Sequence, residues 1–289
     1  MGKRFGDRRD GELIRNVDSM HIIMPLMYPN RCDNEAYIGE IIDLTNVNAY
    51  LEKKNTDNPA YPYKLFQVMV TAMLKAITLR PEMNRFIANK NLYQRNHVSA
   101  AFTVKKIFKD GGDEALAKIN AKPTDTIDTI HDEIFRQVSY VRKDDNKDQS
   151  TQSMDMLQKL PRPLLKMVGA GARFLDRHGW MPASVVATDP YQSSVVLSNI
   201  GSLKMNCGYH HLTNWGTTSV FCLIGQIREK PFIEKDGSTT FRQTVQIGLT
   251  IDERIADGYY YSKTIRLVKK LLENPELLER PLSEEVPLD

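Results

Sequence analysis

A short acidic stretch near the C-terminus carries the side chains best suited to chemistry. It reads Asp252-Glu253-Arg254-Ile255-Ala256-Asp257-Gly258. Such a Gly-containing turn can present its carboxylates at the edge of a sheet, where sites are commonly built, and a carboxylate can serve as a base. The same stretch also fits a plain connector, in which Asp257 caps a helix and Gly258 eases the turn.

The residues on either side of this stretch predict a strand followed by a helix. Apolar residues alternate with smaller or polar residues in the run Val245, Ile247, Leu249 and Ile251. After the turn, they recur four, three and four residues apart in the run Tyr261, Ile265, Val268 and Leu272. Periods of two and of about 3.6 are typical of strands and helices, respectively.

Two further segments hold candidate site residues. Ser198 lies on a predicted short strand that continues into Asn199-Ile200-Gly201. His210 and His211 follow in a polar and aromatic stretch. Neighbouring residues on a strand face opposite ways, so at most one of the two histidines can face a site. Loop or packing roles for both histidines remain open.

Composition excludes several classes of protein. The chain has 289 residues and a net charge of +3, without a dense Lys/Arg stripe, so nucleic acid is not an expected partner. The three cysteines are far apart and show no metal-ligand spacing, which favours a reducing cytoplasm and no metal. No apolar run approaches the ~20 residues of a membrane span, and the N-terminus does not resemble a signal peptide.

The rest of the chain predicts one α/β domain behind an irregular N-terminal arm of about 30 residues, with one short strand or helix in it. Strands are predicted at 36–43, 97–104, 115–119, 194–198 and 219–227, and a hairpin turn at 235–238. Helices are predicted at 45–51, 63–79 and 127–141, with a weaker helical region at 154–177 that is broken near Pro161. Residues 142–153 are expected to form a loop or a solvated helix extension.

The order of these pieces resembles the catalytic domain of 2-oxo acid dehydrogenase acyltransferases and its relative chloramphenicol acetyltransferase. Those families place a His-x-x-x-Asp-Gly motif where this chain has Glu253 to Gly258. Ile41-Ile42-Asp43-Leu44-Thr45 and Arg80-Pro81-Glu82-Met83-Asn84 resemble the family's N-terminal strand and its Pro-Glu-Leu-Asn turn. The resemblance covers residues 31–280, which leaves an arm at 1–30 and a tail at 281–289.

The resemblance implies a two-layer sandwich, with helices packed on a mixed sheet, that assembles as a homotrimer. It implies that acyl-CoA and a small acceptor meet in a channel between protomers. Ser198 would then donate a hydrogen bond to the oxyanion, and Asp257 would hold the motif's geometry. The family's catalytic base is a histidine, and that position is Glu253 here.

Glu253 can replace the missing histidine only under one condition. A carboxylate is a weaker base than an imidazole by about two pKa units, which costs up to about a hundredfold in rate unless burial raises its pKa. Otherwise Glu253 is an exposed turn acid or a partner for Arg254, and catalysis is lost. His211 or its neighbour His210 is the alternative base.

Two hypotheses follow. In the first, the chain is a CoA-dependent acyltransferase acting on a small thiol or hydroxyl, with a lipoyl group as one candidate acceptor. In the second, it is a non-catalytic trimer that binds acyl-CoA or a partner protein. No lipoyl-type lysine hairpin precedes the domain, so the chain is expected to act without a swinging arm of its own and without a membrane.

Overall fold

A six-stranded mixed sheet forms the centre of the computed structural model, which describes residues 4–105, 114–142 and 157–288. Its strands are β2 (Glu35–Asp43), β5 (Val98–Lys105), β6 (Glu114–Ala121), β7 (Val195–Asn199), β8 (Val220–Ile233) and β9 (Thr239–Asp252). They lie in the order β2-β9-β8-β7-β5-β6. β7 runs parallel to β5 and β8, and the other pairs are antiparallel.

Helices cover one face of this sheet, so the fold is the predicted two-layer α/β sandwich. They are α2 (Thr45–Lys54), α3 (Leu65–Leu79), α4 (Ile127–Arg142) and α8 (Gly258–Glu273). The main apolar core lies between α3, α4, α8 and the inward side chains of the strands. The predicted α3 stripe is confirmed, because Val70, Met73 and Ile77 are buried and Phe66 packs beside them.

α3 begins two residues later than the sequence predicts, at Leu65. The reason is local. The Asn55 side chain accepts from the Tyr63 backbone N–H at 2.8 Å and donates to the Tyr63 carbonyl at 2.9 Å. Both backbone groups of Tyr63 are therefore already paired when the helix starts.

The opposite face of the sheet carries a smaller apolar cluster, formed by Ala101, Val196, Leu212, Phe221 and Leu223. The segment from 200 to 216 lies over part of this face and needs close backbone contact. A Cβ at Gly201 would meet the Gly225 carbonyl oxygen at 2.3 Å, and a Cβ at Gly248 would meet the Gly208 oxygen at 2.0 Å. Only glycine allows such an approach.

The N-terminal arm contains both a strand and a helix, where the sequence predicted one or the other. β1 (Gly11–Leu13) pairs with β4 (Asn91–Arg95), which pairs with β3 (Arg85–Ala88) in a separate antiparallel sheet. α1 (Ser19–Met27) follows, capped by Asp18.

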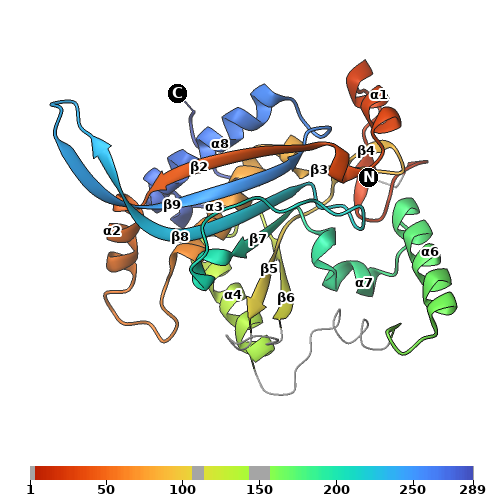
Figure 1. Cartoon of the computed structure of the whole chain (residues 1–289), viewed down its shortest axis with the longest axis horizontal. Helices are drawn as coiled ribbons and strands as arrows, with labels where there is room; N and C mark the ends of the chain where they lie inside the picture. Colours follow the sequence, from red (N-terminus) through yellow and green to blue (C-terminus); the bar gives the residue numbers. More distant parts are fainter. Residues whose placement is uncertain (1–3, 106–113, 143–156, 289) are drawn as a thin grey trace.

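Long connections place two helices at one end of the molecule. α6 (Arg162–His178) and α7 (Ala183–Thr188) lie opposite the end where the β8–β9 hairpin projects (Figure 1). α6 begins at Arg162 because Pro161 ends the preceding segment and Pro163 suits the first turn. It buries only Asp176 and leaves most of its apolar side chains exposed.

The remaining predicted elements are confirmed within a few residues, including β2, β5, β6, β7, α4 and the turn at 235–238. The predicted loop at 142–153 lies outside the described residues apart from Arg142, which ends α4. Within the described ranges, none of the helices has the length and apolarity needed to cross a membrane.

Candidate active site

The acidic stretch forms the connection between β9 and α8. β9 ends at Asp252 and α8 begins at Gly258. Asp257 is the N-cap, with extended backbone angles (φ −77°, ψ 165°), and its carboxylate accepts from the Tyr260 N–H at 2.7 Å. The predicted capping role is therefore confirmed, and such caps stabilise by about 1 kcal/mol.

A buried cluster of charged side chains lies where β9 ends and this connection begins. Arg254 donates two hydrogen bonds of 2.7 Å to the carboxylate of Asp252, which is fully buried. Arg31 approaches the same carboxylate at 3.6 Å. Burial lowers the pKa of Arg31, and Asp252 opposes that change. Arg254 thus pairs with Asp252 and not with Glu253. Glu253 is therefore not the salt-bridge partner of Arg254 that the sequence left open.

Glu253 is exposed in the isolated chain. Its backbone N–H donates to the Asn34 carbonyl at 2.9 Å, which fixes the peptide. Among the described residues, its carboxylate forms no hydrogen bond or ion pair. The Tyr261 hydroxyl lies near enough that the charges of Glu253 and Asp257 add to the burial that raises the pKa of Tyr261.

Ser198 lies at the end of β7 on the wall of a groove of about 500 Å³. The Ser198 Oγ is 3.5 Å from the Thr103 Oγ1 on the neighbouring strand β5. Thr103 was not predicted from the sequence to be a site residue. The signal was present, because Phe102 and Val104 on either side of it are buried, and the side chain between them must point to the opposite face of the sheet. Both hydroxyls therefore face the groove.

His210 lines this groove and His211 does not. The His210 ring stacks on Phe221 with centroids 4.2 Å apart. Its Nδ1 is 2.8 Å from the His211 carbonyl oxygen. Because a carbonyl only accepts, this contact puts a proton on Nδ1, and in the neutral ring Nε2 is then the acceptor. The candidate His211 is exposed and stacks on the outer side of His210 at 4.6 Å.

Aromatic and cationic side chains both line the groove. Phe66, Phe102 and Phe221 supply apolar surface. Lys64, Lys105 and Arg142 also line it. Within the described residues, no group of three or more His, Cys, Asp or Glu side chains is placed to hold a metal ion.

A single chain does not bring Glu253 and Ser198 together. Ser198 is level with Leu223 on β8 and, through it, with Gly248 on β9. Glu253 follows Gly248 by five residues in the opposite direction from the groove. At ~3.3 Å per residue and ~4.8 Å per strand, the two side chains lie roughly 15–20 Å apart.

Comparison with known proteins supports the resemblance drawn from the sequence. Residues 185–279, which include Ser198, Glu253 and Asp257, match the family model described as the 2-oxoacid dehydrogenases acyltransferase (catalytic domain). A search of curated protein sequences found no match.

Solved structures share the fold over nine-tenths of the chain. The cubic core of the pyruvate dehydrogenase multienzyme complex aligns with a TM-score of 0.60 and 12% identity, covering 92% of this chain and 94% of that one. Dihydrolipoamide acetyltransferase from Azotobacter vinelandii aligns with a TM-score of 0.59 and 12% identity, and the alignment covers 92% of this chain and 94% of that one. A chloramphenicol acetyltransferase aligns with a TM-score of 0.56 and 14% identity, and the alignment covers 91% of this chain and 98% of that one. The chain therefore has the chloramphenicol acetyltransferase-like fold.

Proposed function

We propose that this chain is a CoA-dependent acyltransferase, which moves an acyl group between a CoA thioester and a small thiol or hydroxyl acceptor. The observation that carries the proposal is Ser198, on the wall of a 500 Å³ groove within the segment that matches an acyltransferase domain. The aromatic side chains that line the groove suit the pantetheine arm of CoA, and Lys64, Lys105 and Arg142 suit its phosphates. A lipoyl group is one candidate acceptor.

The proposed enzyme is a homotrimer whose sites lie between protomers. The separation of roughly 15–20 Å between Glu253 and Ser198 within one chain supports this arrangement, since the two can meet only if neighbouring copies supply one each. The exposure of Glu253 in the isolated chain also fits an interface position. One structure of this fold is the core of a multienzyme complex.

The proposed reaction is an addition followed by an elimination. Glu253 removes the proton from the acceptor thiol or hydroxyl, and the resulting anion attacks the thioester carbonyl carbon. The Ser198 hydroxyl donates a hydrogen bond to the oxyanion of the tetrahedral intermediate. When the carbonyl re-forms, the C–S bond breaks and the CoA thiolate takes the proton back from Glu253.

Glu253 is our first choice of base because of its spacing. The study of the Azotobacter vinelandii enzyme names a serine, a histidine and an asparagine as the residues tested for catalysis, with the histidine four positions before the asparagine. Glu253 stands four positions before Asp257. His210 is the second choice, because it lines the Ser198 groove and, in the neutral ring, its Nε2 is an acceptor.

A second candidate function is a non-catalytic trimer that binds acyl-CoA or a partner protein. The observation that favours it is the exposed Glu253 carboxylate without a partner among the described residues. A solvated carboxylate is a poor base for a thiol or hydroxyl.

Acyl-CoA turnover by the purified protein separates the two candidates. Release of free thiol is followed with a panel of thiol and alcohol acceptors, including dihydrolipoamide. We expect Glu253→Gln to abolish turnover, whereas Glu52→Gln, an equally exposed glutamate on α2, leaves it unchanged. Activity that survives Glu253→Gln but not His210→Gln moves the base to His210. Intact trimers that bind CoA without turnover favour the non-catalytic candidate.

Ser198→Ala tests the oxyanion role separately from the base. Loss of one such donor typically lowers kcat by about 10²–10³-fold, with a smaller effect on KM. Thr103→Val is the matched control, because it removes the neighbouring hydroxyl and keeps the side-chain shape. Equal losses in the two variants would contradict a specific role for Ser198.

A further inference from the structure

A second cavity, of about 240 Å³, lies on the same face of the sheet as the Ser198 groove but near the other ends of β5 and β6. It shares no lining residue with the groove. The 3-10 helix η3 (Pro190–Gln192) stands between them, because Pro190 and Tyr191 line the groove and Gln192 lines the cavity.

Four cationic side chains line the cavity, and Arg95 is one of them, beside Arg8, Arg9 and Lys118. The Arg95 side chain is 7% exposed and its guanidinium lies 4.7 Å from the centre of the Phe86 ring. The Nη groups donate to the Gln192 carbonyl at 3.3 Å and the Thr217 carbonyl at 2.7 Å. The buried Nε has no partner. Burial lowers the pKa of Arg95 to about 10, which leaves it charged at neutral pH.

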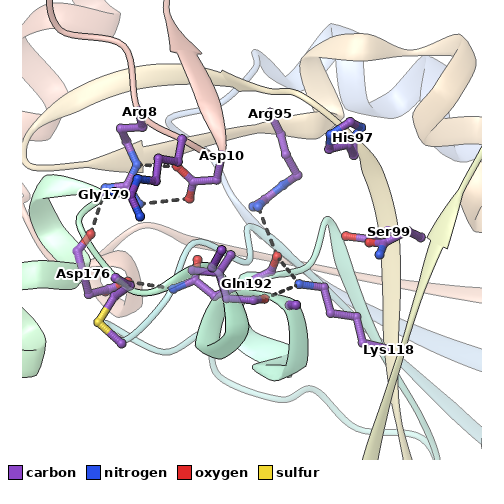
Figure 2. Close-up of a pocket in the computed structure, with 15 residues that line it drawn as sticks. Arg8, Asp10, Arg95, His97, Ser99, Lys118, Asp176, Gly179 and Gln192 are labelled. Carbon is purple, nitrogen blue, oxygen red and sulfur yellow. Dashed lines mark hydrogen bonds and ion pairs between the residues drawn. The ribbon is translucent and has the colours of Figure 1, made fainter.

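Lys118 is a second of these cations, and its side chain is half-buried. Its Nζ donates to the Val186 carbonyl at 2.8 Å and the Gln192 carbonyl at 3.1 Å. Arg95 and Lys118 thus approach the same carbonyl oxygen from different strands, as Figure 2 shows. Among the described residues neither side chain contacts a carboxylate. Two like charges therefore lie close together without a counter-charge in contact.

The nearby carboxylates are Asp10, Asp176 and Asp189, and each already accepts hydrogen bonds from other groups. Asp189 accepts from the Trp215 indole N–H at 2.6 Å and from the Tyr191 N–H at 2.9 Å. Asp10 accepts two hydrogen bonds from Arg8, at 2.8 and 2.9 Å. Asp176 accepts from the Gln192 side-chain amide at 2.7 Å and from the Gly216 N–H at 3.1 Å. Buried cations are normally paired, because an unpaired charge in a medium of low dielectric constant is costly. An anion from outside the chain would supply the missing pairing.

The remaining wall indicates the body of that anion. Met181, Ala183, Val186 and Ala187 supply the apolar part of the lining. Its volume equals that of about eight water molecules in the liquid, at ~30 Å³ each. We propose that this cavity binds a small organic carboxylate with a short aliphatic body, whose carboxylate pairs with Arg95 and Lys118.

Calorimetric titration of the full-length protein with sodium butyrate tests this proposal. Sodium chloride at equal ionic strength and 1-butanol, which keeps the aliphatic body without the charge, are the comparison solutes. We expect saturable binding of one butyrate per chain and none of 1-butanol. Absence of saturable butyrate binding overturns the proposal. Binding of inorganic phosphate with no response to butyrate overturns the choice of an aliphatic carboxylate.

Lys118→Met locates the binding to this cavity. Loss of one charged partner should weaken butyrate binding by about tenfold or more. Lys122→Met is the matched control, because Lys122 follows the same strand, carries the same charge and is exposed; it should bind within twofold of the wild type. Equal binding by the wild type and Lys118→Met contradicts the proposal.

Val186→Phe provides an independent variant, should Lys118→Met fold poorly. It keeps both cations and fills the cavity from the apolar wall, away from the Ser198 groove. We expect butyrate binding to disappear while circular dichroism stays unchanged. Undiminished binding in this folded variant would place the butyrate elsewhere and overturn the assignment.

Discussion

Two groups of cations lie at the same end of the sheet and differ in the groups that they contact. Arg31 and Arg254 both approach Asp252, a carboxylate with no exposed surface. Arg95 and Lys118 both approach a neutral group, the Gln192 carbonyl. The first group shares one buried carboxylate, although the Arg31 Nε, like the Arg95 Nε, forms no hydrogen bond. The second group has no carboxylate in contact among the described residues.

This difference assigns the groups different roles. A carboxylate between two guanidinium groups fixes the β9–α8 connection to the segments around Tyr28, Ile87 and Thr213, whose carbonyls accept from the same two arginines. That suits a structural anchor for the loop that carries Glu253. Two cations without a carboxylate in contact are energetically unfavourable, and an anion that binds in the cavity beside them would stabilise them.

The largest expected effect comes from removing the carboxylate that Arg31 and Arg254 share. Asp252→Asn keeps the shape of the side chain but leaves two buried guanidinium groups without a counter-charge, which should lower the free energy of unfolding by about 3–5 kcal/mol. Urea denaturation measures this loss. Asp57→Asn, at an exposed position, is the control and should change stability by less than ~0.5 kcal/mol. A loss below ~1 kcal/mol in Asp252→Asn would remove the distinction between the two groups.

The next effect is a pH dependence of the group that contains Lys118. Burial lowers the pKa of Lys118 from 10.5 to about 8, with a further contribution from Arg95 and opposition from Asp189 and Asp10. Between these two values the folded chain releases a proton that the unfolded chain retains. The free energy of unfolding should therefore rise with pH across this window, by at most about 3 kcal/mol.

Urea denaturation at pH 7.5, 8.5 and 9.5 checks this sign in the wild type and in Lys118→Met. The difference between the two proteins isolates Lys118 from tyrosines that titrate near the upper limit. Saturating butyrate should flatten the rise, because the anion favours the charged lysine. The same slope in both proteins would mean that Lys118 does not bear a burial penalty.

The smallest effect concerns the cap that orients the Glu253 loop. Asp257→Ala removes the acceptor for the Tyr260 N–H and should cost about 1 kcal/mol. Asp257→Asn should recover most of that loss, since asparagine caps as well as aspartate. Thermal denaturation of the three proteins measures both steps. An equal loss in both variants would indicate that the negative charge, and not the cap, is what matters.

Patterns among residues close in sequence predicted much of the fold and the connection between β9 and α8. The alternation in β9, the four-three-four spacing in α8 and the Asp257 cap are set by residues close in sequence, and all three were predicted. Asp252 is different. Its partner Arg31 is distant in the chain. Its partner Arg254 is two residues away, but the sequence offered Arg254 only as one possible partner of Glu253.

The cavity could not be predicted from the sequence. Arg8, Arg95, Lys118 and Gln192 come from separate segments that meet only after β1 joins β4 and β6 joins β5. No one segment carries a recognisable motif. The sequence favoured His211, but His210 lines the groove. The choice between the two adjacent rings depends on the stacking of His210 on Phe221, a contact that the sequence does not reveal.

The position of η3 has a consequence for regulation. Its three residues form a partition, with Pro190 and Tyr191 facing the Ser198 groove and Gln192 facing the cavity. A carboxylate that draws Arg95 and Lys118 off the Gln192 carbonyl would act on the backbone that borders the groove. Linkage makes such communication mutual: if the small acid changes the affinity for acyl-CoA by some factor, acyl-CoA must change the affinity for the acid by the same factor.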